Sequence, residues 1–451
     1  MYTPPPGTLV VFAHSPAGFG HLRVTLALQE GLGKQGAQVS AMLGTEDPLI
    51  SSIHRVTSVT RFGLAMQEWF QHGLQQRVMT YCFRSLLQMN ARSVVNDIET
   101  IVLARPEKPK HILIVATHFG PAHKIAKMRL EIEERIGIPL TLVVQVTDDS
   151  PLSIWYVPGA DMTCVPSEYT KRELQYYAQS LGDTSYPITA LPYPISPHFS
   201  KVVAHHLCAE KQLQVHPHSH HSIHVAIPIS GAAVGLDFYR HIITRLNHLN
   251  PRFVFHVIVR NISYTKSFIQ KLSLLHFVHL YTAHKSIDVV RLYEKVYEDE
   301  LISLEITKPS EQAFKALEQS SQRGGSVLLF TLPVGRQEYD NISFLRSHGL
   351  VPGLDDTQKM HDSARSKIHL DPFRNQSTRW RGIPLPSGSH DAARFIEHLL
   401  QEHILEDMTP CKISSRTDSA LEVRSDGVHL FWHQVSLLLA RRIDSATMTG
   451  S

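Results

Sequence analysis

The sequence predicts an α/β protein composed of two Rossmann-like domains with a cleft between them. Two observations support this prediction. Short, continuously apolar runs alternate with helix-like stretches, as in parallel sheets that helices cover on both faces, and the alternation occurs twice along the 451 residues. Hydrophobic residues make up 43% and charged residues 19% of the chain, which is typical of a globular protein and excludes a disordered one.

Six apolar runs in the first half are expected to be strands. The first is Thr8 to Ala13, and it is followed by a glycine-bearing loop and by an amphipathic helical pattern that begins at His21. The other five runs are residues 38–43, 112–116, 140–146, 162–165 and 188–191. Strands that alternate with helices in this way indicate a parallel sheet, because each helix returns the chain to the edge where the previous strand began.

The second half repeats the pattern. Its apolar runs are residues 223–229, 253–259, 277–281, 302–306 and 326–330. Between the halves, residues 201–222 contain six histidines and no apolar periodicity, and we interpret them as a linker. The expected organisation is a first domain over residues 1–200, a His-rich linker over 201–222, a second domain over 223–402, and a C-terminal extension over 403–451 that ends in an amphipathic helix. Residues 352–390 are polar, and we expect them to be irregular.

The composition also limits the class of partner. A formal net charge of +3 is too weak to imply nucleic acid. We expect neither a signal peptide nor a transmembrane helix, because the N-terminus lacks a basic segment and no apolar run reaches about 18 residues. The linker histidines are irregularly spaced, which favours a solvated loop over a zinc or nickel site, so we predict no metal. Four scattered cysteines favour reduced thiols in a cytoplasmic protein; they are Cys82, Cys164, Cys208 and Cys411.

The loop after the first strand is the strongest local signal for a functional site. Gly18 and Gly20 allow the backbone to approach a ligand closely. His21 stands where the next helix starts, at the sheet edge where α/β proteins bind ligands. A neutral imidazole at this position can accept a hydroxyl proton as a general base. Spacing alone favours the alternative, a helix-capping loop with a surface histidine.

A second signal follows the strand at residues 140–146. Thr147, Asp148 and Asp149 stand at its carboxyl end, where a carboxylate such as Asp148 can orient a base or bind substrate hydroxyls. Asp and Thr are also preferred at helix N-caps, and from spacing alone we favour that alternative.

Polar residues follow four strands of the second half. Each one alone is more often part of a helix cap than a ligand contact. The carboxyl ends of parallel strands meet at one edge, so together these residues favour a nucleotide site, where cations and helix N-termini bind phosphate. The residues are Gly231, Arg260, Asn261, Lys308, Ser310, Glu311, Gln337, Glu338 and Asn341.

Six short motifs occur in a recognisable order over about residues 8–350. They are Gly18-Phe19-Gly20-His21, Thr147-Asp148 with Trp155, Val165-Pro166-Ser167-Glu168, Arg260-Asn261, Thr307-Lys308-Pro309, and Pro333-Val334-Gly335-Arg336-Gln337-Glu338 with Asn341. In this order they resemble glycosyltransferases of the GT-B fold. The specific branch contains the monogalactosyldiacylglycerol synthases and the bacterial UDP-N-acetylglucosamine transferase that forms lipid II.

The resemblance implies an inverting, metal-independent glycosyltransferase without a cofactor. The second domain would hold a UDP-sugar through the nine residues named above, and the first domain would hold the acceptor beside Gly18 and Gly20. His21 would take the proton of the acceptor hydroxyl, and Asp148 would orient His21. The resemblance also suggests a lipid or lipid-linked acceptor.

Two further expectations follow from a lipid acceptor. The protein would lie in the cytoplasm or at the inner face of the cell membrane. The aromatic stretch over residues 62–89 then has two interpretations: it contacts a membrane surface, or it packs as a core helix, which we favour.

The chain departs from the family's pattern in the second half. Val259 and the pair Ser310-Glu311 replace glycines of the family, and Glu311 would place negative charge near the donor's diphosphate. These departures support an alternative, a GT-B-fold pseudoenzyme that acts as a binding or regulatory protein. His21 and Asp148 lead us to favour the enzyme. A nucleotide-sugar 2-epimerase ranks last, because no acidic cluster is evident.

Overall fold

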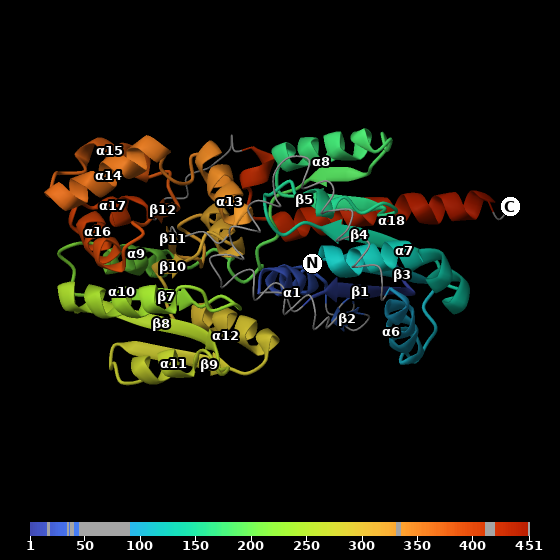
Figure 1. The fold of residues 1–451 in the computed structure, drawn as a ribbon, viewed down its shortest axis with the longest axis horizontal. Coiled ribbons are helices and arrows are strands. Elements are labelled where there is room, and N and C mark those ends of the chain that lie inside the picture. The colour runs from blue at the N-terminus through green and yellow to red at the C-terminus, as the bar shows by residue number, and fades with distance from the viewer. Residues whose placement is uncertain are drawn as a thin grey trace. The chain divides into compact units, whose positions relative to one another are not determined.

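The computed structural model describes residues 1–15, 19–33, 36, 40–44, 91–330, 335–410 and 420–449, with side chains up to Arg442. The chain forms two compact units. The first contains Met1–Pro197 and Ala420–Ser451, and the second contains His198–Ser419. Each unit has a parallel six-stranded sheet with helices interleaved between the strands (Figure 1). The predicted architecture of two Rossmann-like domains is confirmed.

The first sheet has the strand order β2-β1-β3-β4-β5-β6. Val11 of β1 lies opposite Ile114 of β3, which in turn lies opposite Leu142 of β4, and all three side chains are fully buried. This burial explains why these runs are continuously apolar, and the six predicted strands are confirmed. The strands are β1 (Thr8–His14), β2 (Ser40–Gly44), β3 (His111–Ala116), β4 (Leu140–Gln145), β5 (Met162–Val165) and β6 (Ile188–Ala190).

The C-terminal helix α18 (Gly427–Thr449) packs on the first unit. Trp432 is 2% exposed, and its indole N–H donates to the carbonyl oxygen of Leu28 at 2.8 Å. Its ring stacks on Tyr2 with centroids 4.9 Å apart. Figure 1 shows α18 in red beside β4. The other helices that the structure describes in this unit are α1 (Gly20–Glu30), α6 (Arg92–Leu103), α7 (Phe119–Ile136), α8 (Glu168–Ser180), η1 (Ser153–Trp155) and η3 (Leu421–Val423).

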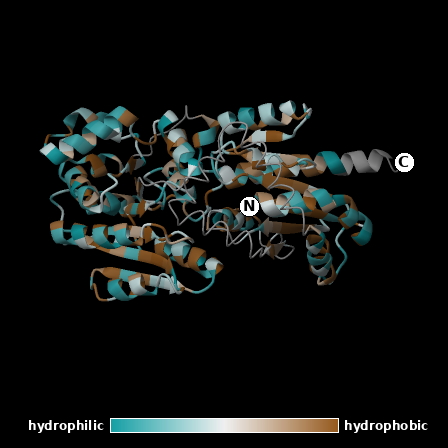
Figure 2. Cartoon of the chain, viewed as in Figure 1, coloured by the Kyte–Doolittle hydropathy of each residue, from teal (hydrophilic) through white to brown (hydrophobic). Residues whose placement is uncertain are grey.

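The second sheet has the strand order β12-β11-β10-β7-β8-β9. Five of its strands lie where apolar runs predicted them, and Figure 2 shows the hydrophobic strands of both sheets between more hydrophilic helices. The strands are β7 (Ile223–Pro228), β8 (Phe253–Arg260), β9 (Val278–Ala283), β10 (Leu304–Thr307), β11 (Ser326–Leu329) and β12 (Gly382–Pro384). The helices are α9 (His205–Gln214), α10 (Leu236–Leu249), α11 (Lys266–Leu272), α12 (Ser286–Asp299), η2 (Glu311–Leu317), α13 (Arg336–Ser347), α14 (Leu354–Ser366), α15 (Asp371–Ser377), α16 (Ser389–Gln401) and α17 (Ile404–Asp407).

Two segments differ from the sequence-based expectation. Residues 201–222 contain helix α9, which buries Cys208 and Lys211 in the second unit. Residues 352–390, expected to be irregular, contain α14, α15 and β12. Helix α14 buries only Thr357 and Met360, so its apolar pattern is too sparse to be visible in the sequence.

Some predicted features lie outside the described residues. These are Gly18, the aromatic stretch 62–89, Cys82, Cys411 and Pro333-Val334. Cys164 and Cys208 are free thiols, and both are buried. Within the described part of the chain, every helix is too short or too polar to cross a membrane.

Candidate functional site

The first unit fixes the ring of His21 in one orientation. Helix α1 begins at Gly20, so His21 lies in its first turn, directly after β1 and its loop. The Nδ1 atom lies 2.8 Å from the carbonyl oxygen of Thr117 and 2.9 Å from Oγ1 of Thr147. A carbonyl oxygen can only accept, so this network assigns the ring proton to Nδ1. The neutral ring therefore holds its lone pair at Nε2, which is the form that a general base requires.

Two buried threonines support this arrangement. Thr25 of α1 donates its hydroxyl proton to the carbonyl oxygen of His21 at 2.7 Å. The hydroxyl of Thr117 therefore donates to Oγ1 of Thr25, also at 2.7 Å. Both side chains are fully buried. They join the first turn of α1 to the end of β3, so the backbone that carries His21 is held by buried hydrogen bonds.

A second histidine stands beside the first. The ring of His118 lies edge-on to that of His21, with centroids 4.5 Å apart. His118 caps helix α7, and its Nδ1 accepts the backbone N–H of Gly120 at 2.9 Å. Its neutral ring consequently carries the proton at Nε2, the opposite tautomer to His21. The rings of Phe119 and Trp155 lie 5.5 Å apart and complete an aromatic group around the two histidines.

The sequence interpretation did not find Thr117 and His118. Both directly follow β3, as Thr147 follows β4, and β3 lies between β1 and β4 in the sheet. Polar residues after a central apolar run are the signal that could have found them.

The two aspartates after β4 differ in environment. Asp149 is 4% exposed and accepts hydroxyl protons from Ser167 and Thr170, so it anchors the start of α8. Ser167 in turn caps α8 by accepting the N–H of Thr170 at 3.0 Å. Asp148 is half-buried at the same strand end, and its role in orienting His21 stays a prediction.

In the second unit, β10 and β11 bring three of the predicted residues together. Lys308 follows β10, and its Nζ lies 2.8 Å from Oε1 of Glu338 on α13. The two side chains are only 7% and 12% exposed. Asn341, one turn further along α13, is fully buried and donates to the carbonyl oxygen of Pro309 at 3.2 Å. These residues form a polar group at the carboxyl ends of adjacent strands. Gln337 precedes Glu338 on α13 and is half-buried.

Three other predicted residues lie at the ends of β7 and β8. Arg260 donates through Nε to the carbonyl oxygen of His284 at 2.8 Å, and the carbonyl oxygen of Asn261 accepts from Nδ1 of His284 at 3.0 Å. The carbonyl oxygen of Gly231 accepts from the hydroxyl of Tyr264 at 3.0 Å. Strand β7 lies between β10 and β8, so both groups of residues share one edge of the sheet.

The loop after β7 contains an unsatisfied hydroxyl. Oγ of Ser230 is buried and has no hydrogen-bond partner within the described residues. Gly235 ends this loop with φ +82°, and an added Cβ would lie 2.7 Å from the ring of Phe330. The glycine is therefore required both by its conformation and by its close packing. A buried hydroxyl without a partner costs free energy, and a ligand oxygen would satisfy it.

The segment after β10 forms a 3-10 helix of seven residues. Ser310 precedes the 3-10 helix η2, which starts at the half-buried Glu311. Lys315 of η2 forms a buried ion pair with Glu305 of β10, and its Nζ lies 4.0 Å from the ring centroid of Tyr297. Glu305 interrupts an apolar strand run, which is the sequence signal for a buried pair. This pair anchors η2 to the sheet.

The sequence matches no family model and no curated protein. Among solved structures, it is similar to the MnaA–UDP co-structure of S. aureus, with 9% identity over 97% of both chains and a TM-score of 0.48. It is also similar to the UDP-GlcNAc 2-epimerase of Neisseria meningitidis bound to UDP-GlcNAc. The sequence identity is 13% over 96% of this chain and 99% of that one, and the TM-score is 0.43. A third similar structure is HepE of Anabaena in complex with UDP and glucose. The sequence identity is 12% over 96% of this chain and 99% of that one, and the TM-score is 0.45.

Proposed function

We propose that this protein is a glycosyltransferase that moves a sugar from a UDP-sugar to an acceptor hydroxyl, with inversion and without a metal. The observation that carries the proposal is the ring of His21. Its Nδ1–H faces the carbonyl oxygen of Thr117, so Nε2 holds the lone pair at the carboxyl edge of the first sheet. The ordered motifs that resemble the GT-B family supply the reaction class.

In this proposal the acceptor's oxygen attacks the anomeric carbon while its proton moves to Nε2 of His21. The bond from the anomeric carbon to the β-phosphate oxygen breaks, and UDP leaves with the electron pair. A single displacement inverts the anomeric configuration. The positive charge formed on the imidazole is stabilised by the Thr117 carbonyl oxygen, which accepts the Nδ1–H at 2.8 Å.

The donor would be held by the second unit. Lys308 can exchange its partner Glu338 for a phosphate oxygen, and the carboxylate released can accept hydrogen bonds from vicinal sugar hydroxyls. The unsatisfied hydroxyl of Ser230 can donate to a phosphate oxygen. The other proposed donor contacts are those that the sequence predicted, and a lipid acceptor rests on the sequence resemblance alone.

One observation favours a second candidate, a protein that binds a ligand without turnover. Lys308 is already neutralised by Glu338, and Glu311 starts the segment in which the family has glycines. A diphosphate must therefore displace an ion pair before it gains the charge of Lys308. A binding protein that never stabilises a leaving group tolerates this arrangement.

The test is release of UDP from UDP-glucose, UDP-galactose and UDP-N-acetylglucosamine in the presence of diacylglycerol or a soluble alcohol acceptor. We expect His21→Gln to lower the turnover at least about 100-fold with UDP affinity unchanged, because general base catalysis contributes this much. His111→Gln is the matched control. That ring bonds Thr141 at 3.0 Å at the opposite end of β3, so its loss should leave turnover unchanged. Full turnover in His21→Gln would refute the assignment of His21 as the general base. UDP binding with no turnover of any donor supports the binding protein.

A further inference from the structure

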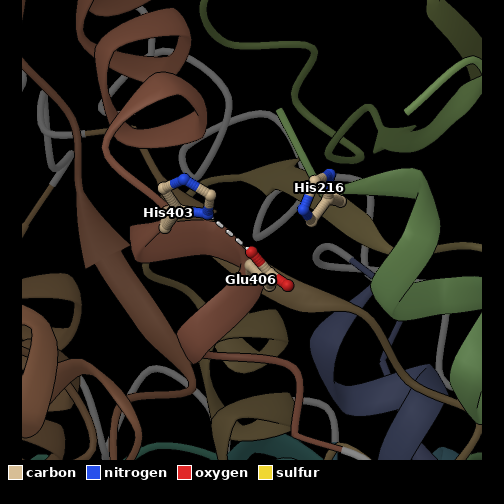
Figure 3. A group of neighbouring side chains, drawn as sticks. All are labelled: His216, His403 and Glu406. Carbon is tan, nitrogen blue, oxygen red and sulfur yellow. Dashed lines mark hydrogen bonds and ion pairs between the residues drawn. The ribbon is translucent and has the colours of Figure 1, made fainter. Parts of the chain in front are cut away.

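Two histidines and a glutamate from distant parts of the chain meet on the second unit. His216 follows helix α9, whereas His403 and Glu406 lie at the start of α17. One ligand atom from each lies within 4.8 Å of the others, and all three residues are half-buried. Figure 3 shows the two rings and the carboxylate facing one another, with a hydrogen bond from His403 to Glu406.

We propose that these residues bind a zinc ion, with His218 as the fourth ligand, in contrast to the sequence-based expectation that the histidine-rich segment 201–222 holds no metal. The His218 ring centroid lies 5.9 Å from that of His216 and 6.3 Å from that of His403, and the latter two lie 5.6 Å apart. Zn–N bonds of about 2.0–2.1 Å in a tetrahedral site place two ring centroids about 5.2 Å apart. The observed separations exceed this value by about 0.4 to 1.1 Å. Small side-chain rotations are enough, and the exposed His218 ring has room for them.

The backbone on both sides of this group is fixed without a metal. The guanidinium of Arg252 donates to four carbonyl oxygens within residues 214–221, at 2.6 to 3.2 Å. His403 has φ +62°, in the left-handed region that favours glycine or asparagine. A histidine kept at a strained position favours a use for its side chain. The loop and the strained residue together hold the ligand atoms close before an ion binds.

The chemistry of the donor set suits zinc. Imidazole nitrogens and a carboxylate oxygen are ordinary zinc ligands, and zinc imposes no electronic preference on their geometry. Nδ1 of His403 and Oε2 of Glu406 lie 2.7 Å apart. Zinc binds a neutral imidazole through the nitrogen that carries no proton, so zinc at Nδ1 of His403 would leave the ring proton at Nε2 and take the place of this hydrogen bond. Zinc also replaces the long hydrogen bond, 3.2 Å, that His216 accepts from the backbone N–H of His218. The ion would join the segment after α9 to α17, which are 187 residues apart, and so stabilise the second unit.

A second group of histidines in the same unit differs from this one. His224 and His256 bond each other directly, with Nδ1 and Nε2 2.9 Å apart. The other nitrogen of His256 lies 3.2 Å from the hydroxyl of Tyr281. Both nitrogens of His256 thus have partners inside the protein. In the group around His403, by contrast, the His218 ring has no hydrogen-bond partner among the residues that the structure describes. We therefore expect one zinc ion per chain rather than two.

The experiment uses the full chain, stripped with a chelator and titrated with zinc chloride in a calorimeter, with the melting temperature recorded alongside. We expect one ion bound with at least micromolar affinity, and a higher melting temperature with zinc. His403→Asn keeps a residue that tolerates φ +62°, so it should fold normally. Both His403→Asn and His216→Gln should weaken zinc binding at least about 100-fold, because losing a ligand lowers the metal affinity more than losing an outer-shell partner does.

The matched control is the double variant His220→Gln/His221→Gln. These histidines are exposed in the same loop and lie outside the proposed ligand set, so the variant should bind zinc like the natural protein. Three outcomes overturn the proposal: no stoichiometric binding, unchanged binding in His403→Asn, or an equal loss in the control. The last result would mean general affinity of a histidine-rich loop.

Discussion

The buried ion pair of Lys308 and Glu338 yields a prediction that can be worked out in free energy. Nζ and Oε1 lie 2.8 Å apart, and the side chains are 7% and 12% exposed. Removing one partner leaves an uncompensated charge in this environment. Lys308→Met or Glu338→Leu alone should therefore cost about 3–5 kcal/mol of stability in the second unit. The double variant replaces the pair by apolar side chains of similar size. It should lie within about 1–2 kcal/mol of the natural protein, because neither charge then remains buried without a partner.

The assay must report on the second unit alone, because a chain of two units need not unfold in one step. Native-state hydrogen exchange measures the opening free energy of β10 and α13, and the amides of β1 and β3 serve as the internal control. The single variants should lower protection in β10 and α13 only. The reasoning would be refuted if each single variant lowered the opening free energy by less than about 1 kcal/mol and the two losses simply added in the double variant.

Three further predictions concern stability. Trp432→Ala should destabilise the first unit by about 3–5 kcal/mol in urea unfolding, because it removes a ring that is 2% exposed and its hydrogen bond to α1. Gly235→Ala should cost about 2–4 kcal/mol from positive φ and the clash with Phe330, whereas Gly349→Ala, with φ +64° and no neighbour within 4 Å, should cost about 1–2 kcal/mol. Burial lowers the pKa of His256 to about 3, so as the pH falls the unfolded chain binds this proton before the folded chain does. The free energy of unfolding should therefore decrease below pH 6.5, by up to about 1.4 kcal/mol per pH unit. His256→Gln should make the free energy of unfolding less dependent on pH between pH 7 and 5.

The sequence predicted eleven strands because their apolar runs are visible, and central strands such as β1, β3 and β4 are apolar throughout since they are buried on both faces. The edge strand β9 is only half-buried or exposed, and its apolar run still predicted it. Prediction from the sequence failed for β12, a strand of three residues, and for α14, which buries only two side chains. Such elements are fixed by their neighbours rather than by their own pattern. The short histidine-rich helix α9 was missed because its buried positions are Cys208, Lys211 and Gln214, two of them polar.

In the candidate site, too, some residues could be found from the sequence and others could not. His21 could be singled out because a glycine-bearing loop between a strand and a helix is visible in the sequence, and its role as a base stays a prediction. Its partners Thr117 and Thr147 could not be assigned, since sheet order alone brings β1, β3 and β4 together. The ion pair of Lys315 with Glu305 likewise depends on tertiary contact.

Calorimetric titration with UDP tests the central claim most directly. The natural protein should bind UDP in the micromolar range. The variant Lys308→Met/Glu338→Leu, whose fold is expected to survive, should bind it at least about tenfold more weakly, because a charged hydrogen bond to phosphate contributes about 1.5–3 kcal/mol. No heat from UDP or any UDP-sugar with the natural protein would contradict the account, as would equal affinity in the double variant.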